Sequence, residues 1–215
     1  MANEGQGGND KERMTYLYQG VSRIFDGYIA GIGLGVLLII ILVVIILASD
    51  DNVTALIHNF GIFFIVIGVI GFPFTFFFMY RGFTYLARAD KGRYGIGTFG
   101  AIGSLALNLV LIPEGALLLV LSISYPIFLV MGVVTIIVGF VFELLMYIAL
   151  YRLGDYFNVG YLTAGIVISL FATVLSAIPM IDIVGGGIIG LVGFVLILVG
   201  LNEVKKKIET QITPK

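Results

Sequence analysis

Cysteine and tryptophan are absent from this sequence of 215 residues, and histidine occurs once, as His58. Without cysteine the chain forms no disulfide bond and holds no iron–sulfur cluster or thiolate-bound metal. One histidine supplies too few ligands for zinc or haem, so we expect neither a metal site nor a bound cofactor. Charged residues make up only 12% of the chain, about half their share in a soluble domain. A net charge of −1 excludes nucleic-acid binding by a basic surface, so we expect no nucleic-acid partner.

Apolar residues are abundant instead, at 60% of the chain, and 29 residues are glycine. Six uncharged runs are each 20 residues or longer, at 27–49, 52–80, 94–113, 115–142, 156–181 and 183–202. An α-helix needs about 20 apolar residues to cross a bilayer. The sequence therefore predicts an all-α, polytopic membrane helix bundle surrounded by lipid. We place six transmembrane helices near 27–48, 59–80, 95–112, 127–151, 160–178 and 184–202.

The basic residues are distributed one-sidedly with respect to these spans. Three precede the first span, four lie between the second and third, one lies between the fourth and fifth, and four follow the sixth. Together these are all 12: Lys11, Arg13, Arg23, Arg81, Arg88, Lys91, Arg93, Arg152, Lys205, Lys206, Lys207 and Lys215. The other gaps carry only acidic charge, at Asp50, Asp51, Glu114 and Asp182. By the positive-inside rule this predicts a multi-pass protein of the plasma membrane with both termini in the cytoplasm.

The pattern along the chain predicts four parts. Residues 1–12 have little to bury and are expected to be a disordered tail. Residues 13–26 carry apolar side chains at helical spacing, which predicts an amphipathic helix at the membrane interface. Residues 27–204 form the six-helix membrane domain, which we expect to be three hairpins, and 205–215 form a basic cytoplasmic tail. Pro113 and Glu114 are placed just after the third span, while a kinked third helix running to about Leu121 is the competing interpretation.

Small residues recur at helical spacing on several predicted spans. They include Gly27, Gly31 and Gly35 on the first span and Gly186, Gly190 and Gly193 on the sixth. Close approach at small residues drives helix association in lipid, where the hydrophobic effect between helices is lost. These faces either join the protein to another chain or form seams within one bundle. The first span is the best candidate for an outward seam, because residues 36–47 are wholly aliphatic.

Glu143 is the one ionisable residue placed well inside a predicted span, where a charge is costly and usually faces protein or water. At about 1.5 Å per residue it lies about 12 Å from the cytoplasmic end of its helix, and Ser104 and Ser169 lie at a similar depth. Asn108 is one turn further out. These groups predict a proton or cation site, with Glu143 protonated when the site is empty because desolvation disfavours its charged form. The alternative is a structural glutamic acid that bonds a neighbouring helix or extends towards Arg152.

Several short motifs are similar to those of a known membrane family. They are Arg81-Gly82-Phe83-Thr84-Tyr85-Leu86, Arg93-Tyr94-Gly95-Ile96-Gly97, Tyr151-Arg152-Leu153-Gly154 and Gly200-Leu201-Asn202-Glu203. Over roughly residues 14–204 the chain resembles the crenarchaeal integral membrane family catalogued as domain of unknown function nine-seven-three. The resemblance implies a polytopic archaeal membrane protein without an established activity, and it assigns no functional residues.

No catalytic motif stands out: the chain has no G-x-S-x-G, no Walker loop and no H-E-x-x-H, so we expect no enzyme. The leading hypothesis is a non-enzymatic accessory or structural subunit of a membrane complex, assembled through its glycine-rich faces with a protein partner or a second copy. The alternative is a small proton- or cation-coupled transporter or channel centred on Glu143. A wet cavity that reaches Glu143 favours transport, and tight dry packing favours the subunit.

Overall fold

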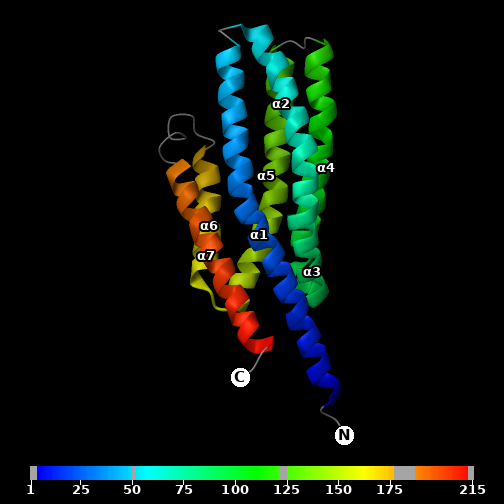
Figure 1. The fold of residues 1–215 in the computed structure, drawn as a ribbon, viewed down its shortest axis with the longest axis vertical. Coiled ribbons are helices and arrows are strands. Elements are labelled where there is room, and N and C mark those ends of the chain that lie inside the picture. Colours follow the sequence, from blue (N-terminus) through cyan, green and yellow to red (C-terminus); the bar gives the residue numbers. More distant parts are fainter. Residues whose placement is uncertain (1–3, 50–51, 122–124, 177–186, 213–215) are drawn as a thin grey trace.

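The computed structural model describes residues 4–49, 52–121, 125–176 and 187–212, and these residues are almost entirely helical, with no strand among them. In chain order the elements are α1 (Glu4–Ala48), α2 (Val53–Phe74), the π-helix η1 (Thr75–Tyr80), α3 (Arg81–Ala89), α4 (Lys91–Leu121), α5 (Tyr125–Tyr156), α6 (Gly160–Ser176) and α7 (Gly187–Ile212). They form one elongated bundle in which the start of α1 and the end of α7 lie at the same end (Figure 1).

Five helices are long and apolar enough to cross a membrane, as expected of a membrane protein: α1, α2 with its continuation into α3, α4, α5 and α7. The described part of α6 has 17 residues, which at 1.5 Å per residue span about 26 Å, short of the ~30 Å hydrocarbon core. The predicted end of this span falls at 177–178, outside the described residues. The structure thus has a helical bundle with five helices long and apolar enough to span a membrane, and the crossing by α6, the predicted fifth span, stays a prediction.

The first helix differs from the parts predicted for it. We expected a disordered tail over 1–12 and a separate interfacial helix over 13–26, but α1 runs unbroken from Glu4 to Ala48. Extending a formed helix adds one hydrogen bond per residue and needs no new nucleus. The apolar stripe of the 13–26 segment is fully buried at Leu17, Val21 and Ile24, because α3 and α7 pack against it. That stripe contacts protein, whereas the sequence placed it on a lipid surface.

Proline shapes the second and fourth helices without ending them. Pro73 lies inside α2, and the π-helix η1 begins two residues later at Thr75. Proline offers no backbone N–H, and a π-turn is one way for a helix to absorb that defect. Pro113 lies inside α4, so our end of the third span near Ile112 is wrong and the competing helix to Leu121 is correct.

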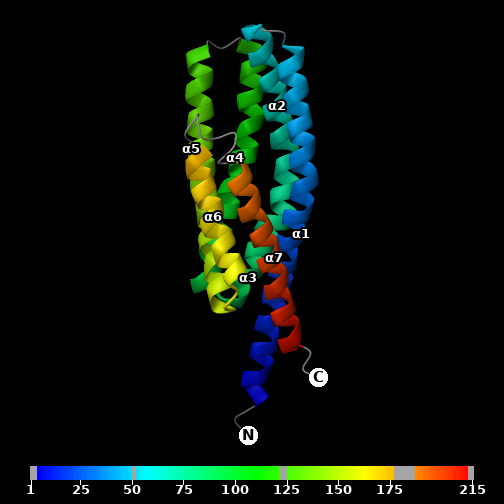
Figure 2. The same cartoon turned by 90° about the vertical axis from the view of Figure 1, so that its left-hand side faces the viewer.

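The three predicted hairpins are not the only pairs of packed helices, and α1 contacts the span that follows it mainly through α3. The α4–α5 and α6–α7 pairs are closely packed, but α2 packs mainly on α4, and α1 contacts α3 and α7 more than α2. In the α6–α7 pair a Cβ at Gly165 would lie 2.7 Å from the Ile197 backbone nitrogen, so glycine sets the helix separation there. Figure 2 shows this pair side by side along the lower part of the bundle, while α1, α4 and α5 continue further.

The lysines and arginines of the described residues lie on helix segments at the end where α1 begins and α7 ends, which we call the basic end. Interhelical polar contacts tie this end together. Arg13 of α1 pairs with Asp90 at 3.7 Å, and the Tyr18 hydroxyl donates to Glu209 of α7 at 2.9 Å. Lys207 of the predicted tail is helical and donates to the backbone oxygens of Phe157 and Asn158. The basic residues therefore share one end of the bundle, as their spacing predicts.

Candidate functional site

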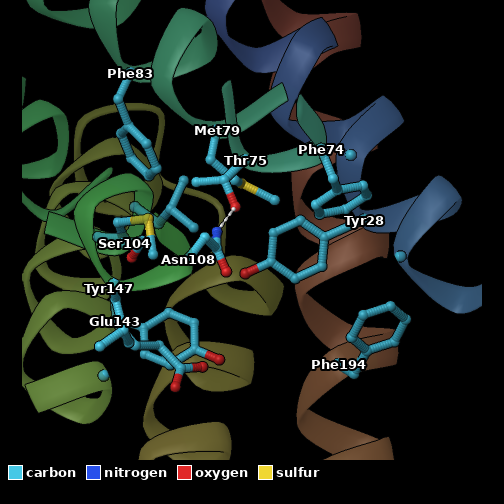
Figure 3. A pocket seen from close by; sticks show the side chains of 16 residues that line it. Tyr28, Phe74, Thr75, Met79, Phe83, Ser104, Asn108, Glu143, Tyr147 and Phe194 are labelled. Carbon is cyan, nitrogen blue, oxygen red and sulfur yellow. Dashed lines mark hydrogen bonds between the residues drawn. The ribbon is translucent and has the colours of Figure 1, made fainter. Parts of the chain in front are cut away.

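A partly open cavity of about 500 Å³ lies between α1, α4, α5 and α7 and the continuous segment of α2, η1 and α3. Its walls are mostly apolar and aromatic, with a few polar groups that converge on one region (Figure 3). The lining residues are Gly27, Tyr28, Gly31, Phe74, Thr75, Met79, Phe83, Ser104, Leu107, Asn108, Gly139, Glu143, Met146, Tyr147, Leu150 and Phe194. This size and composition are typical of a small-molecule site.

Glu143 is the one acidic or basic residue among those lining side chains. It is half-buried on α5, and no salt bridge in the described part of the chain includes it. Tyr147 is one helical turn away on the same face of α5 and interacts with Glu143, and Tyr28 of α1 faces both. The carboxyl group therefore faces open space and phenol hydroxyls, with no built-in cation to neutralise it.

Asn108 and Thr75 form the second polar part of the wall. The Asn108 side-chain amide donates to the Thr75 hydroxyl at 3.0 Å, which joins α4 to η1. Gly71 makes room for this pair, because a Cβ there would lie 2.8 Å from Asn108 Oδ1. π-Helical turns occur frequently at functional sites, where they re-aim side chains into the bundle.

Three of the four predicted site residues line the cavity and one does not. Glu143, Ser104 and Asn108 share it, in agreement with the depth estimate from their positions along the helices. Ser169 is buried on α6 against Gly193 of α7, and it reaches the cavity through Tyr147, which interacts with it. Ser169 thus supports the site from outside the cavity wall.

The predicted helix-packing glycines have different surroundings. A Cβ at Gly27 would lie 2.7 Å from Phe78 Cβ, so Gly27 marks a tight contact of α1 with η1, whereas Gly31 opens on the cavity, 3.6 Å from Phe74. Gly35 has no neighbour within 4 Å. Gly193 packs tightly on α6 and Gly190 loosely, at 3.7 Å from Ala172. Gly186 lies outside the described residues.

Glu114, which we had placed in a turn outside the membrane, lies within α4. It accepts hydrogen bonds from the Thr135 hydroxyl of α5 at 3.0 and 3.2 Å, so it joins α4 and α5. Thr135, Gly139 and Glu143 follow one another at four-residue spacing on α5. Glu114 does not line the cavity, which makes it a natural reference for Glu143.

Sequence reasoning missed Tyr28, Thr75, Tyr147 and the aromatic wall of Phe74 and Phe194. Some signals were present. Tyr147 is one turn from Glu143, and Pro73 inside an apolar run marks a disturbed helix next to Thr75. Tyr28 ends the apolar stripe of the first helix, and its ring lies 5.4 Å from that of Phe194. Nothing in the linear sequence, however, places α1 beside α7.

Within the described ranges no three His, Asp or Glu residues gather as metal ligands would. Comparison with known proteins gives no relative: no family model, no curated protein and no solved structure matches the chain.

Proposed function

We propose that the protein is a six-span integral membrane protein of the plasma membrane, with its basic end in the cytoplasm. The clustering of the basic residues at that end supports this orientation. The apolar run at 160–178 supports α6 as a membrane-spanning helix in addition to the five longer ones. Because the chain has no cysteine, single cysteines report their side without background. His58→Cys should react with an impermeant maleimide in intact cells, and Arg88→Cys should react only after lysis. The reverse pattern would contradict the orientation.

We further propose that it is a small proton- or cation-coupled transporter centred on Glu143. One observation carries this proposal: a cavity of about 500 Å³ reaches a carboxyl group that has no basic partner, where polar groups of α1, η1, α4 and α5 converge. Glu143 interacts with Tyr147 but also lines this open space, whereas Glu114 accepts hydrogen bonds from Thr135 and does not line the cavity. A carboxylate that can hold either a proton or a cation couples the two by exchange.

Proteoliposomes test this function. Protein reconstituted with an imposed proton gradient and a pH-sensitive dye inside should collapse the gradient when a transported cation is added outside. Glu143→Gln should abolish the collapse, because the amide keeps the shape and loses the proton site. Glu114→Gln is the matched control, since it removes a carboxyl group of α4 that does not line the cavity, and it should retain the flux. Equal activity in all three proteins would contradict the role of Glu143.

An accessory-subunit role is the second candidate function, supported by the outward face of α1. Gly33 and Gly35 have no neighbour within 4 Å, and the residues around them are exposed and aliphatic. By contrast, Gly27 and Gly193 make tight contacts with helices of the same chain, so these two positions require no second protein chain. If α1 is an assembly face, the protein in mild detergent should exceed the mass of one 23.3 kDa chain, and Gly35→Leu should reduce it to a monomer.

A further inference from the structure

We propose that the cavity binds a lipophilic, monovalent organic cation, whose charge is held by Glu143 and whose apolar body lies among the rings of Tyr28, Phe74 and Phe194. This inference rests on the proposed transport function and names its substrate class. It is argued from the charge, the size and the chemistry of the cavity wall.

The charge of the site calls for one positive charge. Glu143 is the only acidic or basic residue in the wall, so an ionised carboxylate there has no protein cation beside it. The titratable groups that face it are Tyr28 of α1 and Tyr147 of α5, while α4, η1 and α7 present Ser104, Thr75 and Phe194. A bound cation would neutralise this charge, which is unfavourable while it stays unpaired within a mostly apolar wall. A dication or an anion would leave excess charge in the bundle.

The size and lining of the site do not match the coordination shell that a bare metal ion requires. Sodium or magnesium ions are held by several oxygens that close around them, whereas this wall is mostly apolar and encloses about 500 Å³. That space fits an organic molecule. Aromatic faces attract organic cations, and Figure 3 shows Tyr28, Phe74 and Phe194 on one side of the cavity with Glu143 and Tyr147 on another. The charged and apolar parts of one ligand would thus meet different walls.

Tetraphenylphosphonium is a suitable probe, because it is lipophilic and permanently charged and therefore does not titrate itself. Its binding to wild-type protein in nanodiscs is measured by equilibrium dialysis. Tetraphenylborate has the same shape and the opposite charge, so it reports partition into lipid and apolar surface. We expect Glu143→Gln to weaken phosphonium binding about tenfold or more, as the loss of a charge-paired contact does, and not to weaken borate binding. Glu114→Gln should leave both unchanged.

Two glycines of α1, one helical turn apart, test the position of the ligand. Gly31 opens on the cavity and Gly35, one turn further, has open space around it. Gly31→Leu should fill the cavity and weaken phosphonium binding, and Gly35→Leu, which carries the same change in helix propensity, should not. Tyr28→Phe keeps the ring and should retain most of the affinity, whereas Tyr28→Leu should lose about threefold to tenfold, the range of one cation–π contact.

The outcomes separate this inference from the function on which it rests. If flux in proteoliposomes depends on Glu143 but phosphonium binding is the same in wild type and Glu143→Gln, the ligand class is wrong and the transporter stands. If phosphonium binding depends on Glu143 but no cation collapses the gradient, the transporter is wrong and the binding site stands. Glu143-dependent binding of ²²Na⁺ with no effect of the phosphonium ion would also overturn the organic cation.

Discussion

The two halves of the bundle hold their helices together in different ways. Toward the basic end, large side chains such as Leu17, Phe83, Leu86 and Ile197 are fully buried in one continuous cluster. Toward the opposite end the helices are more apolar, yet they expose residues such as Leu47, 75% of whose surface is accessible. Composition alone therefore does not reveal where a membrane helix is buried. In lipid an exposed leucine costs nothing, so the core lies where helices converge on small residues.

Gly193 and Gly35 give the largest expected contrast between the halves. In Gly193→Leu the new Cβ would lie 2.8 Å from the Ser169 backbone nitrogen and 3.0 Å from the Gly165 oxygen, and a backbone does not yield as a side chain does. We expect a loss of about 3 kcal/mol or more in stability, or failure to fold. Gly35→Leu, with no neighbour within 4 Å, should change stability by less than about 0.5 kcal/mol. Monodisperse yield and thermal unfolding in mild detergent measure both, and equal losses would break the comparison.

Two leucines test burial directly. Leu86 has no accessible surface, so Leu86→Ala should cost about 2–5 kcal/mol through lost contacts and a cavity. Leu47→Ala removes the same atoms from an exposed position and should cost little. The measurement is the free energy of unfolding in mixed micelles titrated with denaturing detergent. A large loss in Leu47→Ala would mean that a partner covers the opposite end of α1.

Polar contacts are expected to contribute more to stability where apolar packing is sparse. Substitutions at Thr135 test this expectation. Thr135→Val removes the hydrogen bonds to Glu114 and leaves a half-buried carboxyl group without that donor. The expected loss is about 1 kcal/mol. Thr135→Ser keeps the hydroxyl and should be close to wild type. The difference between the two thermal unfolding temperatures isolates the hydrogen bond from the change in shape.

The smallest effect is expected for the Tyr18–Glu209 hydrogen bond, which joins α1 to α7 at the densely packed basic end. Because this contact is exposed and water can replace it, Tyr18→Phe should cost only about 0.5 kcal/mol. A double-mutant cycle with Glu209→Ala measures the coupling between the two side chains. A coupling larger than that of Thr135 with Glu114 would reverse the view that polar contacts contribute more at the opposite end.

Part of the candidate site could be predicted from the sequence because helical rise is fixed. Counting residues placed Glu143 and Ser104 at matching depths and Asn108 one turn further out, and all three line one cavity. Ser169 had a suitable depth as well, but depth says nothing about the direction a residue faces around its helix axis, and it faces α7. Glu114 was misplaced because proline next to a carboxylate resembles a turn, although a helix within a bundle accommodates both.

The sequence by itself determined the helical class, the presence of long apolar helices and the gathering of basic residues at one end, because all three depend on local composition and run length. It predicted six such helices, and five are long and apolar enough to cross a membrane in the structure. The tertiary structure alone decided that α1 lies against α3 and α7, that most glycine contacts are internal, and that Tyr28 faces Tyr147 across a cavity at Glu143. These features join residues far apart in the sequence, by more than a hundred positions for Tyr28 and Tyr147. In apolar helices the faces are nearly alike, so only packing selects which of them meet.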